Sequence, residues 1–332
     1  MKHSRRARWI LGITAAPLII WSGYWAAAAY AFEQGAHLAA REAHKSGVSA
    51  QFQDISVQGY PTEFEVGVSD ISVGVENTLT WETQKAVLHT ASFKPNEISL
   101  DLSETHQING SFGATTIATK QAELSILVRP SWLIPLGKIA LKAEDMAIEH
   151  ADGFKANLGS VFATVTSYAD PKEAYNLAAE LDNISLGRLL PELPPAYHSV
   201  QALRFNSDVL FDAAWDRKAM SRGLPALQKT VLNEIRFDFG DANISATGQL
   251  THEAAFGPTG QINLTVQGWQ SLFELAKSLG YVAPNLEDMF FTLLTDLAAQ
   301  TGSSDTITLP LTLQNGRVSY GALTFGTLPK GR

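Results

Sequence analysis

Apolar and polar residues alternate with a period of two along most of the chain after residue 48. The clearest run places apolar side chains on odd positions from 203 onward, between Arg204, Asn206, Asp208 and Asp212. Successive side chains of a β-strand point to opposite faces, so this spacing gives a strand one apolar and one wet face. The sequence therefore predicts a mainly β (α+β) fold built from many amphipathic antiparallel strands.

Strands are expected wherever this alternation returns. The same period occurs around Val66 and around Leu141, and further strands are expected at 85–93, 97–103, 112–118, 121–128, 155–166, 231–239, 306–313 and 317–325. Segments 244–251 and 261–267 read as a hairpin whose turn is Gly257-Pro258-Thr259-Gly260. The apolar positions change from even to odd after Gly67, which predicts a bulge or bend near Ser69-Asp70.

Helical spacing is confined to a few segments of the body. Residues 268–280 carry apolar side chains on one side, and a second helix is expected after Asn285, which is placed to cap it, with its end at Gly302. A weaker third helix is expected at Pro171 to Glu180. The loop 129–136 holds Trp132-Leu133-Ile134 between prolines; we expect this cluster to be buried, with an exposed contact tip as the alternative.

The N-terminal segment from Trp9 to Phe32 carries no charged residue. As a helix it measures about 36 Å, enough to cross a hydrocarbon core of about 30 Å. Lys2, Arg5, Arg6 and Arg8 precede it, which predicts a cytoplasmic N-terminus and an exported body. The expected anchoring aromatic residues, by their place near the two boundaries, are Trp9, Trp21, Tyr24, Trp25 and Tyr30.

A cleaved signal peptide is the competing interpretation of this segment. Ala29-Tyr30-Ala31 has the small-x-small form of a cleavage site, but apolar regions of signal peptides run to about 7–15 residues, which favours the retained anchor. We therefore divide the chain into a cytoplasmic tail (1–8), a transmembrane anchor (9–32), a helical extension (33–47), an N-terminal β lobe (48–190) and a C-terminal β lobe with two helices (191–332). The lobe boundary is placed around 185–197.

Composition narrows the possible functions. The formal net charge of −8 argues against nucleic acid as a partner, and the absence of cysteine removes disulfides and thiolate chemistry. Motifs for a nucleophile elbow, a zinc protease, a phosphate loop or a dinucleotide site do not occur. His37 and His44 lie seven apart without further ligands, so we read them as surface residues. No catalytic residue, metal or cofactor is predicted, and we expect a protein that is not an enzyme.

The expected helices are too few to cover so many apolar strand faces. The sheet then either folds on itself as a flattened sandwich or curls into a groove whose apolar lining is completed by a hydrophobic ligand. The residues expected to line such a groove all lie on apolar strand positions. They are Phe64, Val66, Val68, Leu203, Phe205, Val209, Phe211, Ile244, Leu250, Ile262, Leu264 and Val266.

Two stretches resemble a known family. Gly59-Tyr60-Pro61-Thr62-Glu63-Phe64 enters a strand, and the chain closes with 309–321 and then Leu323-Thr324-Phe325-Gly326. With the anchor and the 248–266 hairpin, these stretches resemble the domain of unknown function 2125 family, which is grouped with AsmA-like envelope proteins. The resemblance implies an inner-membrane-anchored periplasmic protein with an elongated, curved antiparallel sheet, and AsmA-like relatives are associated with phospholipid transport.

These observations lead to two functional hypotheses. The first is a single-pass inner-membrane protein whose periplasmic body binds or passes a lipid-like ligand in envelope maintenance. The second is a non-catalytic scaffold that recruits an envelope protein partner through a sheet edge or the late helices. Membrane lipid is the expected partner of the anchor in either case.

Overall fold

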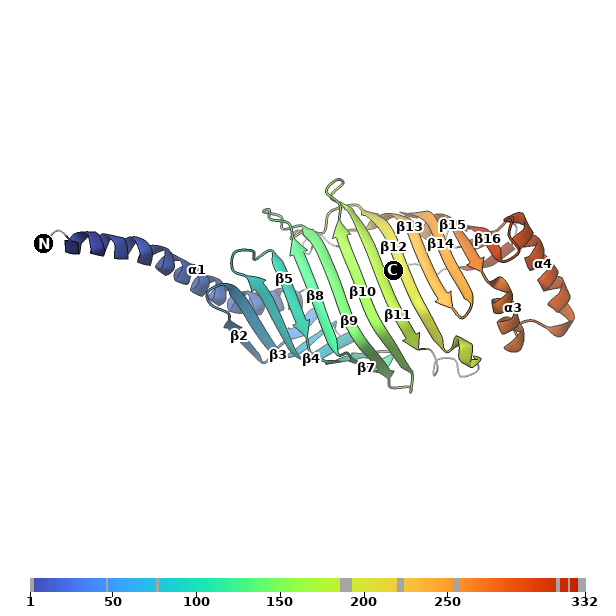
Figure 1. Ribbon diagram of the computed structural model, residues 1–332, viewed down its shortest axis with the longest axis horizontal. Helices are drawn as coiled ribbons and strands as arrows, with labels where there is room; N and C mark the ends of the chain where they lie inside the picture. The colour runs from blue at the N-terminus through green and yellow to red at the C-terminus, as the bar shows by residue number, and fades with distance from the viewer. Residues whose placement is uncertain are drawn as a thin grey trace. The chain divides into compact units, whose positions relative to one another are not determined.

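The computed structural model describes residues 3–45, 47–75, 78–185, 193–219, 224–253, 257–314, 317–321 and 323–327. The described chain separates into two compact units, one formed by residues 1–118 and 122–126 and the other by residues 119–121 and 127–332. Both units are built mainly from antiparallel strands, as the alternating pattern predicts. Figure 1 shows the strands and helices in chain order.

The first unit contains one long helix and most of the first eight strands. Its elements are α1 His3–Lys45, β1 Val48–Gln51, β2 Asp54–Gln58, β3 Glu63–Val75, β4 Leu79–Ala91, β5 Glu97–Leu102, β6 Thr105–Gly110, β7 Gly113–Ala118 and most of β8 Gln121–Val128. Strand β3 pairs with β1, β2 and β4, and β4 continues onto β5 and β6. The core of this unit therefore lies along β3 and β4.

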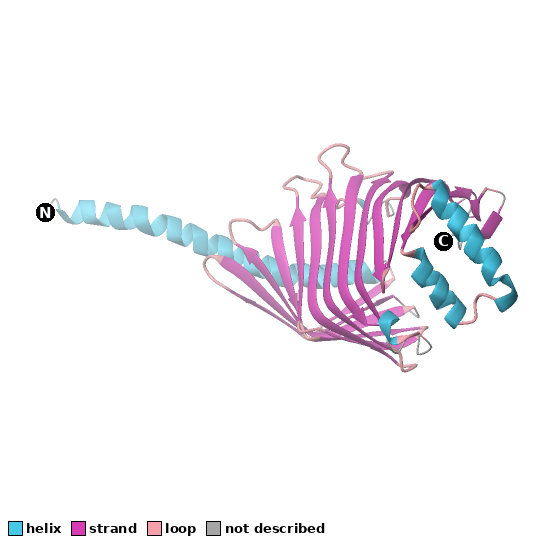
Figure 2. Cartoon of the chain, turned by 45° about the vertical axis from the view of Figure 1, so that its right-hand side comes forward, coloured by secondary structure: helices cyan, strands magenta, loops and turns pink. Residues whose placement is uncertain are grey.

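Within its described residues, the second unit carries seven long strands, then a helical hairpin and three further strands. Its elements are β9 Leu136–His150, β10 Lys155–Ser167, β11 Ala174–Ser185, β12 Ser199–Phe211, β13 Leu227–Phe239, β14 Ala242–Glu253, β15 Gly257–Gln267, α3 Trp269–Ser278, α4 Glu287–Gln300, β16 Thr306–Gln314, β17 Arg317–Tyr320 and β18 Leu323–Thr327. Each strand from β9 to β16 pairs with the next one in the chain. Figure 2 shows α3 and α4 side by side near β16.

Several predicted elements are confirmed. The helix expected to end at Gly47 runs to Lys45, and Gly47 has a φ of 79°, the left-handed value that favours glycine at a helix end. Both late helices form, and the 244–266 hairpin is β14 and β15. The bend expected at Ser69-Asp70 is present, because Asp70 has a φ of 49° inside β3.

A positive φ at a non-glycine residue inside a strand also occurs in the second unit. Asp145 and Asn183 have φ values of 49° and 55° within β9 and β11. Aspartate and asparagine tolerate this left-handed conformation better than other non-glycine residues. The apolar positions of β9 change from odd at Ala143 to even at Ile148 across Asp145. Such a residue therefore keeps one face apolar where a strand bends.

Four predictions need correction. The helix expected at 171–180 is wrong, because Ala174–Ser185 is strand β11, held by pairing with β10 on one side and β12 on the other. Tertiary pairing overrides the helix propensity of its alanines. The turn of the late hairpin does not lie at Gly257 to Gly260, since those residues pair within β15. Asn285 lies in a 3-10 helix, Pro284–Leu286, and the residue before α4 makes no side-chain cap.

The fourth correction concerns the loop around Trp132. Burial of Trp132, Leu133 and Ile134 was expected, but their side chains are 81%, 38% and 46% exposed. Backbone hydrogen bonds from this loop to 215–217 hold the main chain inward, so the side chains point to solvent. The alternative, an exposed tip, is the structure found.

The division between the two units does not fall at the expected lobe boundary of 185–197. Strands β11 and β12 flank that connection and pair with each other along most of their length. Both strands therefore belong to the second unit. Residues 186–192 of this connection lie outside the described residues. The two compact units instead divide near residues 118–127.

Candidate functional site

The strands of the second unit align their apolar side chains into continuous rows. Paired positions carry one row through all eight strands from β9 to β16, in the order Leu141, Ala163, Ala179, Phe205, Ile235, Ala246, Leu264 and Leu309. The neighbouring row, two residues along each strand, is Ala143, Val161, Leu181, Leu203, Phe237, Ile244, Val266 and Ile307. Antiparallel register therefore joins isolated strand patterns into one apolar face, which we call the apolar sheet face.

Helices α3 and α4 cover one end of the apolar sheet face. Trp269 and Phe273 of α3 form a buried cluster with Ala298 of α4 and Ile307 of β16. Val266, Leu294, Leu297 and Leu309 pack against this cluster. The Trp269 indole N–H also donates to the Ser304 carbonyl at 3.2 Å, which fixes the helical hairpin to the strand that follows. The β15–β16 end of the face is therefore closed by the protein itself.

Between Ala143 of β9, which is 1% exposed, and the helical hairpin, much of the apolar sheet face is less completely buried. Leu203, Phe205, Phe237 and Ile244 are only partly buried, and Ile235 in the middle of one row is 37% exposed. Leucine and phenylalanine side chains in a closed core are usually almost fully buried. Covering the apolar side chains on β12 to β14 with another apolar group would therefore be favourable, because it removes apolar surface from water.

The opposite face of these strands is polar and internally bonded. The Asp208 carboxylate accepts hydrogen bonds from the Tyr168 hydroxyl at 2.7 Å and from the Asn176 and Asn233 amides at 2.9 Å each. Burial raises the pKa of Asp208, but the hydrogen bonds from these three residues outweigh it and bring the pKa below 3.8. Arg204 pairs with Glu180 at 2.8 Å on the same face. This face is wet, as predicted.

The expected lining residues of the second unit fall into two groups. Leu203, Phe205, Ile244, Leu250, Ile262 and Leu264 are partly buried on the apolar sheet face. Val266 packs under the helical hairpin, Val209 is buried, and Phe211 lies edge-on to both Tyr175 and Trp215. Of the first group, the residues of β12 and β14 lie on the less completely buried part of the face, whereas the second group contacts protein.

Of the expected lining residues of the first unit, Phe64 is covered by α1. Phe64 and Val66 are 1% and 5% exposed, and the rings of Trp25 and Phe32 lie 5.3 Å and 5.2 Å from that of Phe64. Val68 is partly buried in the same strand. A ligand would reach Phe64 only if α1 moved away.

Two strands, β11 and β13, place residues on the apolar sheet face that were not predicted to lie there. Leu177, Ala179 and Leu181 belong to β11, where a helix was expected, and Ile235 and Phe237 of β13 were not singled out. The alternation of Leu177, Ala179 and Leu181 with Asn176, Glu180 and Asp182 was the available signal.

The expected anchoring residues are placed as far as the structure describes them. The side chain of Trp9 lies outside the described residues. Trp21 and Trp25 donate indole hydrogen bonds to the carbonyls of Pro61 and Glu63, at 2.9 Å each. The Tyr24 hydroxyl donates to the Ser92 carbonyl at 2.9 Å, while Tyr30 is 63% exposed. Across the described residues, no helix has both the length and the apolar character needed to span a membrane.

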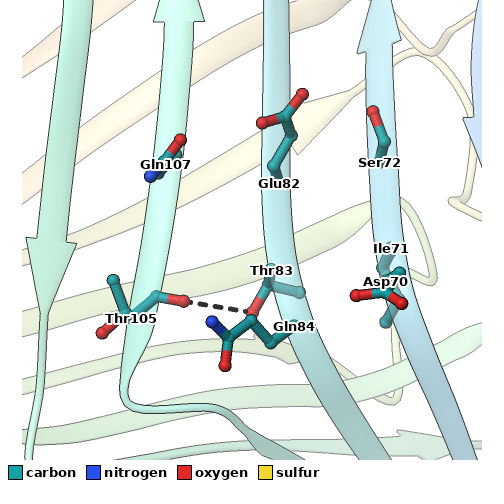
Figure 3. A pocket seen from close by; sticks show the side chains of 8 residues that line it. All are labelled: Asp70, Ile71, Ser72, Glu82, Thr83, Gln84, Thr105 and Gln107. Atoms are coloured by element: carbon teal, nitrogen blue, oxygen red, sulfur yellow. Dashed lines mark hydrogen bonds between the residues drawn. The ribbon is translucent and has the colours of Figure 1, made fainter.

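Two hollows in the first unit are lined by polar and charged residues together with apolar surface. One, with a volume of about 300 Å³, lies against the bend at Asp70 and is drawn in Figure 3; its lining includes Glu82, Gln84 and Gln107. The other, of about 840 Å³, lies between α1 and β1 and is lined by His37, Arg41, His44 and Phe52 among others. Both histidines are exposed, as expected, and the His37 ring lies 5.0 Å from that of Phe52.

His106 is a buried polar residue that the sequence did not single out. Its side chain is 6% exposed, and neither ring nitrogen has a hydrogen-bond partner. Its ring lies 5.8 Å from that of Trp81 with the planes inclined by 24°. Burial lowers the pKa of His106 below 6.5, and the backbone of Ser103 opposes this shift. Burial therefore favours the neutral form of the ring.

Groups able to hold a metal ion were also sought. Within the parts of the chain that the structure describes, no three His, Asp or Glu side chains come together for that purpose.

Comparison with known proteins gives one match. No curated protein and no solved structure matches the chain. The model of a family described as an uncharacterized protein conserved in bacteria, DUF2125, matches residues 25–329. This match covers α1 from Trp25 onward and every strand of both units. The chain therefore belongs to the DUF2125 family of bacterial proteins.

Proposed function

We propose that this protein binds a lipid-like ligand on the apolar sheet face and acts in envelope maintenance without catalysing a reaction. The observation that carries the proposal is the set of two apolar rows, which cross eight strands in register while helices cover only the β15–β16 end. A single-layer sheet with one wet face needs a cover for the other face. A lipid acyl chain supplies such a cover without any polar partner.

The energetics favour a long apolar ligand over a small polar one. Burying each methylene contributes about 0.8 kcal/mol, so an acyl chain lying along several strands gains binding free energy in proportion to its length. The two rows contain no charged or amide side chain, so headgroup recognition would have to come from elsewhere. The proposed site therefore favours ligands with long acyl chains.

We also propose that the protein is tethered to the bacterial inner membrane by its N-terminal segment, with both units in the periplasm, as a resemblance to AsmA-like proteins would imply. The charge-free run from Trp9 to Phe32 and the cations before it support this arrangement. Leu18, Ile19 and Ile20 are 65%, 70% and 72% exposed, so the protein gives them no cover. Trp21 and Trp25 donate to carbonyls of the first unit, so the C-terminal part of the charge-free run also packs on protein.

The ligand proposal is tested by native mass spectrometry of the detergent-extracted protein and by titration with a fluorescent phosphatidylethanolamine. Ile235→Asp places a charge in the middle of one apolar row, at a position exposed enough to keep the sheet folded. Thr247→Asp places the same charge on the wet face of β14 and is the matched control. We expect lipid to co-purify with the parent and the control, and binding to fall about tenfold in Ile235→Asp.

Two outcomes would contradict the ligand proposal. One is a parent protein that neither retains lipid nor binds added phosphatidylethanolamine. The other is an equal loss of binding in both variants, because the effect would then come from charge and not from the apolar sheet face. Circular dichroism of each variant confirms that the sheet has formed.

The tether is tested separately with single cysteines, since the chain contains none. A Thr247→Cys protein in intact cells should react with a membrane-impermeant maleimide, because Thr247 is exposed and the body is expected outside the cytoplasm. The protein should also stay with the membrane fraction at alkaline pH. Labelling that requires cell lysis would refute the periplasmic placement.

A second candidate function is recruitment of a partner protein, and one observation favours it. Met289, Phe290 and Leu293 of α4 are 55%, 37% and 49% exposed, although apolar side chains of a helix normally face the core. Leu293→Glu would leave lipid binding unchanged and abolish partner capture under this hypothesis. The ligand proposal predicts instead that Leu293→Glu changes neither lipid content nor function.

A further inference from the structure

The loop between β8 and β9 presents consecutive apolar side chains to solvent. Trp132, Leu133 and Ile134 are 81%, 38% and 46% exposed. An isolated apolar residue on a surface needs no explanation, but an indole exposed to this extent beside two aliphatic side chains is uncommon. This group, residues 132–134, is called the apolar tip below.

The backbone holds the apolar tip in one conformation. The amide of Arg129 donates to the Pro135 carbonyl at 2.9 Å, which closes the base of the loop. The amide of Ile134 donates to the Ser131 carbonyl at 3.1 Å, and the amide of Arg217 donates to the Leu133 carbonyl at 2.9 Å. These bonds order the loop, so the exposed side chains are held there and do not simply fluctuate outward.

Ile134 adopts a conformation that its side chain disfavours. Its φ is 47°, in the left-handed region, where a β-branched residue is strained by about 1–2 kcal/mol. Glycine or asparagine would relieve this strain at no cost to the loop hydrogen bonds. An isoleucine that is both strained and 46% exposed contributes little to the stability of the fold. Its presence at this position therefore suggests a function at the surface.

Two arginines support the base of the apolar tip. The Arg217 guanidinium carbon lies 5.0 Å from the centre of the Trp132 ring, a cation–π arrangement. The Arg129 guanidinium donates to the carbonyls of Ser167 and Tyr168 at 3.0 Å and 2.9 Å. The apolar tip is thus an indole and two aliphatic chains with two arginines at their base, where Asp216 also precedes Arg217. An indole and aliphatic chains beside guanidinium groups suit the boundary between acyl chains and headgroups.

The area of the apolar tip decides between a protein partner and a membrane. An aromatic residue contributes about 150–250 Å², so three side chains offer roughly 400 Å² at most. A stable protein interface buries about 800 Å² on each partner. Insertion into a bilayer has no such minimum, because its free energy scales with the apolar area inserted and with the attraction of cations to anionic headgroups.

We infer that the apolar tip, Trp132 to Ile134, inserts into the interface of a lipid bilayer. This contact goes beyond ligand binding on the apolar sheet face and does not depend on it. It also does not depend on the N-terminal tether, since it concerns a loop of the second unit. The tip would hold that unit against a membrane surface.

The test uses the full chain, which contains no cysteine of its own. Leu133→Cys is labelled with the fluorophore NBD, and the protein is reconstituted with vesicles of phosphatidylethanolamine and phosphatidylglycerol. The same vesicles are prepared with nitroxide-labelled acyl chains as a quencher. Thr247→Cys, exposed on the wet face of β14, carries the label in the matched control. Both readouts are local, so they report the tip however the rest of the chain binds.

At position 133 we expect a blue shift of the emission and quenching by the nitroxide lipid, and at position 247 neither. Adding Trp132→Ala to the Leu133→Cys chain should lower the quenching by about twofold or more. A label at 133 that stays in water would overturn the inference. So would a label that is shielded from water but not quenched by the lipid, because the tip would then contact protein.

Failure of the ligand proposal is separable from failure of this inference. Lipid retained by the detergent-extracted protein reports the apolar sheet face, whereas quenching at position 133 reports the apolar tip. Ile235→Asp should lower the first measurement and leave the second unchanged. A protein without retained lipid but with a quenched tip would contradict the ligand proposal alone.

Discussion

The indole of Trp25 in α1 lies stacked on the ring of Phe64 in β3, with the ring centres 5.3 Å apart and the planes inclined by 19°. The same indole donates a hydrogen bond to the Glu63 carbonyl at 2.9 Å. Phe64 is only 1% exposed under this cover. The outer part of α1 therefore belongs to the core of the first unit.

Trp25→Ala should destabilise the first unit. The change removes the stacking on Phe64 and leaves the Glu63 carbonyl without its donor, which together should lower the free energy of unfolding by about 2–4 kcal/mol. Urea unfolding followed by circular dichroism measures the loss. Tyr30→Ala is the control, because Tyr30 is 63% exposed and should change stability by less than about 0.5 kcal/mol. Equal effects of the two changes would show that α1 does not pack on β3.

His106 should make the first unit sensitive to acid. Burial lowers the pKa of His106 in the folded state below 6.5, so only the unfolded chain takes up a proton as the pH falls through that value. Stability is therefore complete above about pH 6.5 and declines below it until the folded-state pKa is reached. Urea unfolding at a series of pH values measures this decline.

Two substitutions separate the titration of His106 from its packing. His106→Phe keeps the stacking on Trp81 and needs no hydrogen bond, so it should reduce the acid sensitivity without loss of stability near neutral pH. His106→Ala should reduce the acid sensitivity equally but lower stability at every pH by leaving a cavity. Unchanged acid sensitivity in both variants would show that other groups cause it.

Asp208→Ala should weaken the wet face of the second unit slightly. Its three hydrogen-bond donors are partly exposed and can turn to water, so the expected loss is about 1 kcal/mol. Because hydrogen bonding holds the pKa of Asp208 below 3.8, its contribution is present above that pH and disappears as the carboxylate protonates at lower pH. Denaturant unfolding should therefore separate parent and variant near neutral pH but not in strong acid. Thr247→Ala, on the same face, should leave the profile unchanged.

Gly248→Ala should disrupt the pairing of β14 with β15. A Cβ at this position would lie 2.3 Å from the Gln261 carbonyl oxygen and 2.9 Å from the Ile262 Cα, so the strands would have to separate. We expect a loss of about 2–3 kcal/mol in the free energy of unfolding and a lower melting temperature. Gly35→Ala is the comparison, because nothing lies within 4 Å of its Cβ position in α1. That change should stabilise by about 0.5–1 kcal/mol, and a neutral Gly248→Ala would mean that the hairpin register differs.

The alternation of residues such as Leu203, Phe205 and Val209 was enough to predict strands, because each position along a strand fixes the face to which its side chain points. The even-to-odd change around Asp70 likewise predicted a bend that the backbone confirms. The late helices followed from their apolar spacing. What these features share is that they depend on neighbours within a few residues of the chain.

The candidate site was only partly predictable, because the strand that carries Leu177 was expected to be a helix. The segment Ala174–Ser185 reads as a helix on propensity, and it becomes a strand because β10 and β12 offer hydrogen bonds on both sides. Phe64 and Leu203 both lie at apolar positions of alternating segments, yet Phe64 is 1% exposed beneath Trp25 of α1 whereas Leu203 is only partly buried. Alternation therefore identified apolar positions without showing which ones the protein covers.

The sequence by itself determined the class of fold, the bends within strands and the apolar or wet character of each strand position. The tertiary structure decided which strands pair, that α1 packs on β3, that the helical hairpin covers only the β15–β16 end of the apolar sheet face, and that Trp132 faces solvent. The physical reason is that secondary structure follows from the local period of side chains, whereas burial depends on segments brought together from distant parts of the chain.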